Sequence, residues 1–288
     1  MFLRVSGPVP PPVSSYLVCA TPRSGSTLLC EALAATAVAG RPAEYFEAMY
    51  DTVLPRRPTD YFDGLRALQA AGFVTDHLPA EGGDAREALR QAATYRDYLS
   101  WVFAAGTTPN GVFAAKLMWG HVDHFVSYLR DLPEHAGKPA PKMFAEVFPS
   151  LRYVRVLRRD KVRQAVSLWK ALQTATWRIE RSRAGGEERR RSQEGEFSFD
   201  AIDHLRRQIS VQEIAWTQYF DENGIEPLTI VYEDLIDAHE ETLDETLGYL
   251  ELPPQARSAP AHEMHRQADS TSEKWVGRYL RGEYARRR

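Results

Sequence analysis

Four short apolar runs, separated by longer stretches with helical spacing, constrain the fold of this chain more than any other feature. The runs are SYLVCA (residues 15–20), GVFAAKLMW (111–119), LRYVRVLR (151–158) and LTIVYE (228–233). Between them lie stretches such as EALRQAATYRDYLSWVFAA (87–105) and QISVQEIAWTQYF (208–220), in which apolar residues recur at helical intervals. This alternation predicts an α/β fold, with a parallel sheet flanked by helices.

Length and composition indicate one large globular domain, or one domain with an appendage. The chain has 288 residues, of which 43% are hydrophobic and 26% charged, so it can bury a sizeable core. We expect a flexible leader over the proline-rich residues 1–14 and a single domain over residues 15–288. The stretch at 178–198 is charged and poor in apolar residues, which predicts a mobile loop.

The chain shows neither a targeting signal nor a spacing typical of a metal site. Without an apolar signal segment or a run of about 18 apolar residues, we expect a cytoplasmic protein with no stable membrane insertion. The formal net charge is −3, and we expect no nucleic-acid partner. Cys19 and Cys30 lie in apolar segments and are predicted to be buried. His262 and His265 form an HxxH pair without a third ligand, so we expect no metal.

The stretch YLVCATPRSGSTLLCEAL, residues 16–33, predicts a binding loop. A strand ending at Ala20, a turn and a helix beginning near Ser26 would aim several backbone N–H groups and the positive helix end at one point. Gly25 would let the backbone approach a ligand closely, and Ser26 and Thr27 would add hydroxyl donors. A simple helix cap is the alternative. The carboxyl edge of an open α/β sheet is where ligands bind, which favours an anion site.

Two common nucleotide-binding motifs and one hydrolase motif are missing from the sequence. G-x-x-x-x-G-K-[ST] does not occur, since the one Gly-Lys pair, at Gly137, is followed by proline. G-x-G-x-x-G does not occur either, which counts against a dinucleotide-binding dehydrogenase. Pro22 stands where the nucleophile elbow G-x-S-x-G needs its first glycine, which counts against a hydrolase.

The segment TPRSGSTLL, residues 21–29, resembles the 5'-phosphosulfate loop of sulfotransferases that use 3'-phosphoadenosine 5'-phosphosulfate (PAPS). The longer run YLVCATPRSGSTLLCEALAATAVAGRPAEYFE is similar to the bacterial Stf0 group of these enzymes. Further similar segments follow in order at residues 108–119, 157–174 and 266–279. The resemblance therefore spans nearly the whole chain, and it implies a P-loop-like sulfotransferase fold.

The resemblance also implies where the donor binds. The loop residues implied to hold the 5'-phosphosulfate are Arg23, Ser24, Gly25, Ser26 and Thr27. The 3'-phosphate would be held by an arginine at the end of the run 151–158 and by Ser167 on the following helix. Arg159 lies eight residues before Ser167, as in the wider sulfotransferase family, whereas the Stf0-like alignment favours Arg158. Both arginines stay candidates.

Arg23 stands where many eukaryotic cytosolic relatives have a lysine. Arginine stays protonated at any working pH, so Arg23 can stabilise negative charge on the leaving oxygens but cannot donate its proton to them. Sulfuryl transfer, like phosphoryl transfer, mainly needs in-line positioning and charge stabilisation at the leaving group. We therefore expect an electrostatic role for Arg23, with PAP as the released product.

The resemblance places the catalytic base at Glu44, in the sequence AGRPAEYFE. A carboxylate within roughly 3 Å of a sugar hydroxyl would accept its proton. Glu47 is the rival, and an exposed loop acid is the alternative for Glu44. Lys116 follows the apolar residues GVFAA and either binds the sulfuryl oxygens or caps a strand end.

Aromatic side chains beside these segments suit a sugar acceptor, although core packing explains most aromatics. They are Tyr45, Phe46, Trp119, Trp169 and Trp177. Trehalose is the first acceptor to consider, but Arg41 departs from the family pattern near the base. The resemblance further implies a homodimer. A kinase-like phosphotransferase and an inactive nucleotide-binding or sugar-binding protein are the alternatives.

Overall fold

The computed structural model of the protein describes residues 11–47, 61–62, 83–174, 195–254 and 270–286. Four parallel strands form one sheet in the order β2-β1-β3-β4. Their bounds are Ser14–Ala20 (β1), Val112–Met118 (β2), Leu151–Leu157 (β3) and Leu228–Val231 (β4). All four predicted apolar runs are therefore strands, and the α/β fold with a parallel sheet is confirmed.

The strand register brings the predicted site segments to one edge. Val18 of β1 is paired with Lys116 of β2 on one side and with Val154 of β3 on the other. Because the strands are parallel, the segments that follow Ala20, Met118, Leu157 and Val231 all leave at the carboxyl edge of the sheet. Ligands of open α/β sheets bind at this edge.

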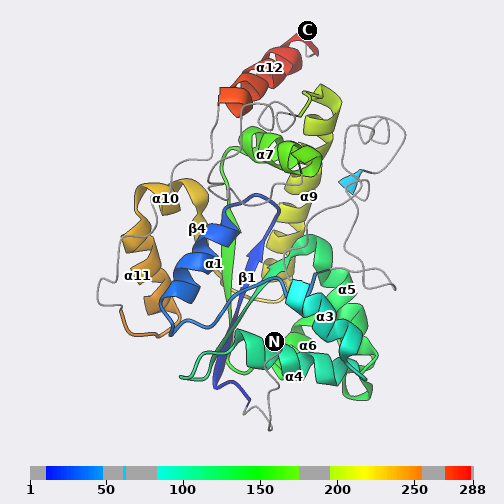
Figure 1. The fold of residues 1–288 in the computed structure, drawn as a ribbon, viewed down its shortest axis with the longest axis vertical. Coiled ribbons are helices and arrows are strands. Elements are labelled where there is room, and N and C mark those ends of the chain that lie inside the picture. Colours follow the sequence, from blue (N-terminus) through cyan, green and yellow to red (C-terminus); the bar gives the residue numbers. More distant parts are fainter. Residues whose placement is uncertain (1–10, 48–60, 63–82, 175–194, 255–269, 287–288) are drawn as a thin grey trace, which may run out of the picture.

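Helices cover both faces of the sheet (Figure 1). One face carries α1 (Ser26–Ala35), α10 (Tyr232–Asp237) and α11 (His239–Tyr249). On the other side lie α3 (Gly83–Gln91), α4 (Tyr95–Gly106), α5 (Trp119–Arg130), the 3₁₀ turn η2 (Pro133–His135) and α6 (Ala140–Val147). The long helix α9 (Phe199–Glu222) contacts α5 and α7 (Lys161–Thr174), and α12 (Ser270–Arg286) contacts α7.

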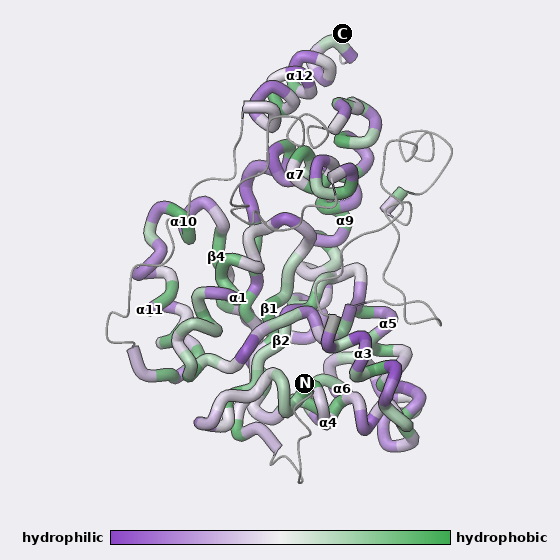
Figure 2. The backbone as a smooth tube through the Cα atoms, viewed as in Figure 1, coloured by the Kyte–Doolittle hydropathy of each residue, from purple (hydrophilic) through white to green (hydrophobic). Residues whose placement is uncertain are grey.

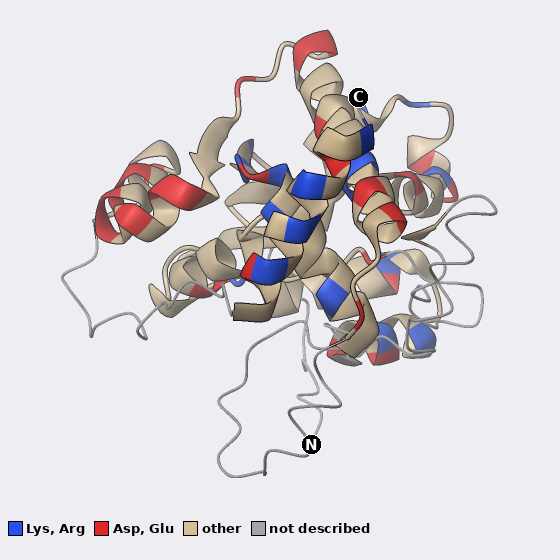
Figure 3. Ribbon diagram, turned by 90° about the horizontal axis from the view of Figure 1, so that it is seen from above, with Lys and Arg blue, Asp and Glu red and all other residues tan. Residues whose placement is uncertain are grey.

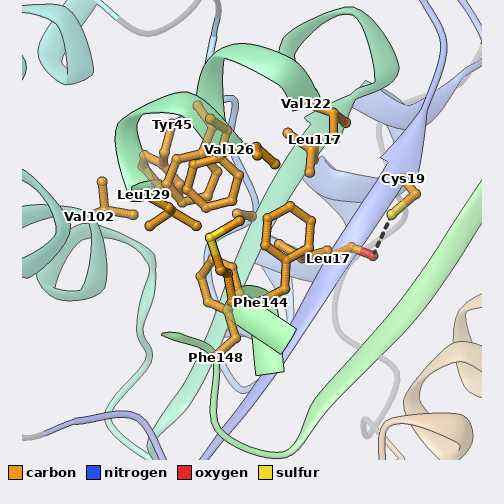
Figure 4. Packing of buried hydrophobic residues seen from close by; sticks show 14 of the residues in the cluster. Leu17, Cys19, Tyr45, Val102, Leu117, Val122, Val126, Leu129, Phe144 and Phe148 are labelled. Carbon is orange, nitrogen blue, oxygen red and sulfur yellow. Dashed lines mark hydrogen bonds between the residues drawn. The ribbon is translucent and has the colours of Figure 1, made fainter. Parts of the chain in front are cut away.

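Alternate side chains of β1 enter two different cores. Leu17 and Cys19 join an aromatic cluster with Phe144 and Phe148, as the close-up in Figure 4 shows. Tyr16, with Val18 and Ala20, packs on the α1 and α11 side. Because both faces are covered, β1 is a nearly continuous apolar run, and the hydropathy colouring in Figure 2 is mostly pale green along β1. Both cysteines are buried, as predicted.

The helical stretch at 87–105 is interrupted. It forms α3 and α4, and Thr94 caps α4 in a capping box with Asp97. Thr94 accepts a hydrogen bond from the backbone N–H of Asp97, which satisfies a helix-end donor that would otherwise be unpaired. A local polar contact, invisible to hydrophobic periodicity, therefore separates the two helices.

The boundaries of the expected leader and loop are only partly visible. Ser14 is already the first residue of β1, one residue before the expected domain start. Glu196, near the end of the stretch 178–198, accepts a hydrogen bond from Trp169 on α7. Residues 1–10 and 175–194, and with them Trp177, lie outside the described residues, as do His262 and His265. Among the described helices, none combines the length and apolarity needed to cross a bilayer.

Candidate active site

The chain reverses direction between β1 and α1 in five residues, 21–25. Gly25 is the N-cap of α1 with φ 92°, and Arg23 also has a positive φ of 61°. No side chain caps the helix, so backbone donors of its first turn are left for a ligand. Ser24 is fully buried, and its Oγ has no hydrogen-bond partner among the described residues. A buried hydroxyl without a partner at a helix N-terminus fits an anion better than a simple cap.

Tyr232, the first residue of α10, packs directly against the loop. A Cβ added at Gly25 would collide with Cδ2 of Tyr232. Glycine is therefore required at this position both by its left-handed φ and by the neighbouring ring.

Two side chains that belong to none of the sequence motifs donate hydrogen bonds to residues 20–22, where the loop begins. Trp216 of α9 donates through Nε1 to the carbonyl of Ala20 at 3.0 Å. Gln164 of α7 donates to Thr21 Oγ1 at 3.0 Å and to the carbonyl of Pro22 at 2.8 Å. Gln164 lies one helical turn before Ser167, and this spacing is the signal that would have identified it.

Arg23 contacts both Arg158 and Ser167, two of the residues that the resemblance places at the 3'-phosphate. Arg23 donates from Nε to Ser167 Oγ at 3.0 Å. Arg158, directly after β3, donates from Nη1 to the carbonyl of Arg23 at 3.4 Å. The turn after β1 and the start of the β3–α7 connection therefore share one surface.

Arg158 is the less exposed member of the arginine pair, and its side chain is half-buried. Burial lowers the pKa of its guanidinium, whereas the neighbouring Tyr232 and Glu233 act in the opposite direction. Its guanidinium carbon lies 4.5 Å from the ring centroid of Tyr232. Nε of Arg158 is buried without a hydrogen-bond partner among the described residues. A desolvated cation with an unsatisfied donor favours binding of an anion, since the anion would restore the lost solvation.

Arg159 is bound to α10 instead. Its side chain is 60% exposed and forms an ion pair with Asp234 at 2.5 Å. The hydrogen bond with Asp234 raises the pKa of Arg159. The backbone N–H of Arg159 donates to Glu233 at 3.0 Å. The structure thus brings Arg158, but not Arg159, to Arg23 and Ser167.

Glu44 and Lys116 form a largely buried ion pair at the same edge of the sheet. Lys116 Nζ lies 2.7 Å from Glu44 Oε1, and the two side chains are 4% and 13% exposed. Lys116 also donates to Thr27 Oγ1, in the first turn of α1, at 3.0 Å. One ammonium group therefore connects the candidate base to the candidate phosphosulfate loop, and Glu44 is not an exposed loop acid.

The segment before Glu44 runs along the edge strand β2. Gly40 N–H donates to Thr108 Oγ1 at 3.1 Å, and Lys116 N–H donates to the carbonyl of Ala43 at 2.8 Å. Tyr98 fixes the following residue by donating its hydroxyl to the carbonyl of Tyr45. These backbone contacts place Glu44 beside Lys116.

Arg41 lies towards the opposite end of β2. Its backbone N–H donates to Gly106 O at 2.9 Å, and its guanidinium donates to Thr107 O at 2.7 Å. Both partners precede β2, so the guanidinium is held at the amino end of the strand, whereas Glu44 lies at the carboxyl end. The side chain of Arg41, the residue that departs from the family pattern, therefore lies away from Glu44.

Most of the aromatic candidates for the acceptor site belong to the core. Trp169 is fully buried and Phe46 stacks on Phe125 at 4.0 Å between ring centroids. Tyr45 is buried, which raises the pKa of its hydroxyl to about 12. Trp119 is half-buried against Trp216. Glu47, the rival base, is half-buried with Oε2 shielded from solvent.

Charges are unevenly distributed around this edge (Figure 3). Helices α10 and α11, at the left of Figure 3, carry several Asp and Glu residues and no Lys or Arg. Helix α7 has the sequence KVRQAVSLWKALQT, with three basic residues and no acidic one. In the ranges that the structure describes, no group of three or more His, Cys, Asp or Glu residues forms a metal-binding cluster.

A comparison with protein families identifies the chain. The model of the Stf0 sulphotransferase family matches residues 15–282. The chain belongs to this family. The family membership makes the protein a sulfotransferase and disfavours the kinase-like alternative.

Two relatives of this Stf0 sulfotransferase are trehalose 2-sulfotransferases. The protein of Mycolicibacterium smegmatis is 36% identical over 269 residues, which are 93% of this chain and 95% of the relative. That of Mycobacterium tuberculosis is 34% identical over 271 residues, 93% of this chain and 94% of the relative. The crystal structure of a sulfotransferase from Alicyclobacillus acidocaldarius aligns with 96% of this chain and 94% of its own, with a TM-score of 0.42 and 13% identity.

We predict that Gly25→Ala destabilises this sulfotransferase more than Gly224→Ala does. Both glycines have positive φ, 92° and 61°, but only Gly25 faces another side chain, since nothing lies within 4 Å of a Cβ at Gly224. The φ penalty is about 1–2 kcal/mol at either site, and the collision with Tyr232 adds about 1–3 kcal/mol at Gly25. Urea unfolding of the two variants measures the difference, and equal losses would contradict the packing of Tyr232 on the loop.

Proposed function

We propose that this Stf0 sulfotransferase transfers the sulfuryl group of PAPS to a hydroxyl of a carbohydrate and releases PAP. One observation carries the proposal: Arg23 donates to Ser167. PAPS has two separate anionic groups, the 5'-phosphosulfate and the 3'-phosphate. The contact joins the loop after β1 to the helix after β3. A single PAPS molecule can therefore place its 5'-phosphosulfate at the loop and its 3'-phosphate at the helix.

The residues present suit both anionic groups. At the 5'-phosphosulfate, the backbone N–H groups of the α1 N-terminus and the buried Ser24 hydroxyl would act with Arg23. At the 3'-phosphate, Arg158 would supply its unsatisfied buried donor, and Ser167 can donate its hydroxyl proton while accepting from Arg23. We assign the 3'-phosphate role to Arg158 because Arg159 is paired with Asp234.

PAPS supplies the sulfuryl group, and the side chains of the site move the proton and stabilise charge. Glu44 accepts the proton of the acceptor hydroxyl as the new O–S bond forms and the bond from sulfur to the bridging oxygen breaks. Arg23 and the loop amides stabilise the negative charge that appears on the leaving phosphate. Lys116 holds Glu44 at a fixed distance from the loop, which favours in-line geometry.

Trehalose is the first acceptor to test. The two relatives are trehalose 2-sulfotransferases and align over nearly their whole length. Arg41 lies at the opposite end of β2 from Glu44, so this departure from the family pattern does not argue against a similar acceptor. A homodimer in the cytoplasm stays a prediction.

We predict that Arg158→Ala weakens PAP binding by about 10- to 150-fold, because charge-assisted hydrogen bonds contribute about 1.5–3 kcal/mol. Arg159→Ala is the matched control, since it removes the same charge from the neighbouring residue and should change affinity less than about threefold. Isothermal titration with PAP at low and moderate salt measures both. A larger loss of PAP affinity in Arg159→Ala than in Arg158→Ala would assign the 3'-phosphate to Arg159 instead.

We predict that Glu44→Gln lowers kcat by about 10²- to 10⁴-fold, the range of general-base catalysis. The amide oxygen can still accept from Lys116, so the fold and PAP binding should persist. Glu47→Gln is the control and should retain kcat within about threefold. Transfer of radiolabelled sulfate from PAPS to trehalose gives both values.

The same experiment separates the remaining alternatives. Loss of turnover in Glu47→Gln alone would make Glu47 the base. A wild-type protein that binds PAP but sulfates none of a panel of sugars would favour the inactive binding protein.

A further inference from the structure

Gln164 is a fully buried polar residue in the middle of the donor site. It lies on α7 one turn before Ser167 and has no exposed surface. Its amide donates to the hydroxyl of Thr21 and to the carbonyl of Pro22, the two residues before Arg23. Gln164 thus holds the loop just before Arg23, and Ser167 accepts a hydrogen bond from the Arg23 guanidinium.

The orientation of the Gln164 amide follows from chemistry. A proline carbonyl can only accept a hydrogen bond, so the amide atom 2.8 Å from Pro22 O must be the nitrogen. The amide oxygen is then left buried, with no hydrogen-bond partner in the described part of the chain. An unpaired buried acceptor costs stability. The residue therefore contributes less to stability than its two hydrogen bonds alone would indicate.

Arg23 needs such support because its backbone is in the left-handed region, with φ 61°. A residue other than glycine is strained there and stays only where its surroundings hold it. The carbonyl of Pro22 belongs to the peptide bond that leads into Arg23, so its hydrogen bond with Gln164 restrains that peptide directly.

We propose that Gln164 is a positioning residue for sulfuryl transfer, holding the Arg23 backbone so that the guanidinium meets the charge on the leaving phosphate. The inference rests on the proposed function, because it assumes that Arg23 acts on a PAPS-type donor. Arg23 stabilises mainly charge that develops in the transition state. Misplacing it should therefore lower kcat more than it weakens ground-state binding.

The direct test is Gln164→Met, which keeps the length and volume of the side chain but removes its hydrogen bonds. We expect kcat with PAPS to fall about tenfold to a hundredfold, the effect of two lost hydrogen bonds on a transition state. The dissociation constant for PAP should change less than about threefold. The thermal midpoint should fall only modestly, because the variant leaves Pro22 O and Thr21 Oγ1 without a donor but also removes the unpaired amide oxygen.

Gln173→Met is the matched control on the same helix. Gln173 is also buried, but it bonds the backbone of Glu196 through both amide atoms, at 3.0 and 2.7 Å, instead of the loop before Arg23. This variant should lower the thermal midpoint more than Gln164→Met does and leave kcat with PAPS near the wild-type value. Gln164→Met should therefore mainly lower kcat, whereas Gln173→Met should mainly lower the thermal midpoint.

Gln164→Glu adds a readout that a purely structural role would not move. An ionised carboxylate introduced at this position cannot donate to Pro22 O, whereas the protonated acid can, and burial favours the protonated form. We expect the ratio of variant to wild-type kcat to rise as the pH falls. A flat ratio together with an unchanged kcat in Gln164→Met would overturn the inference. If wild-type protein neither binds PAP nor turns over PAPS, the proposed function falls and this inference falls with it.

Discussion

The reversal of the chain within five residues after β1 fixes where every other part of the site must lie. Gly25 can make this turn because it has no Cβ to meet Tyr232, and the turn leaves the N-terminus of α1 uncapped at the carboxyl edge of the sheet. Parallel pairing then brings the ends of β2 and β3 to the same edge. Lys116 and Arg158, which belong to those strand ends, reach the loop from opposite sides.

Two charges on either side of the loop, the buried Lys116 and the half-buried Arg158, are stabilised in different ways. Lys116 is neutralised by Glu44 at 2.7 Å, so its desolvation is largely offset within the protein. The guanidinium of Arg158 lies against the ring of Tyr232 and donates to the carbonyl of Arg23 at 3.4 Å, and burial lowers its pKa. A buried ion pair is a costly way to stabilise a fold, and in the proposed mechanism this pair holds the base beside the loop. A bound anion would therefore be stabilised more by Arg158 than by Lys116, which is already paired with Glu44.

The strands and the loop were predictable from the sequence because their signals are local. Apolar runs identified all four strands, and the residues 21–29 identified the turn into α1. The family resemblance added Glu44 and the pair of arginines. The sequence could not distinguish Arg158 from Arg159, since only the tertiary contacts with Asp234 and with the loop separate them. Gln164 was missed although it lies one helical turn before Ser167, because the hydrogen bonds that distinguish it from other glutamines are made with a distant segment, the loop after β1.

The central claim is that the loop holds the phosphosulfate of a PAPS-type donor, and its most direct test is thermal stabilisation by PAP compared with ATP and Mg²⁺. PAP at about a hundred times its dissociation constant should stabilise the folded protein by roughly 2.7 kcal/mol, seen as a rise in the unfolding midpoint. We expect this rise with PAP and little or none with ATP and Mg²⁺. Stabilisation by ATP and Mg²⁺ alone would contradict the account, because the loop would then serve a kinase-like donor.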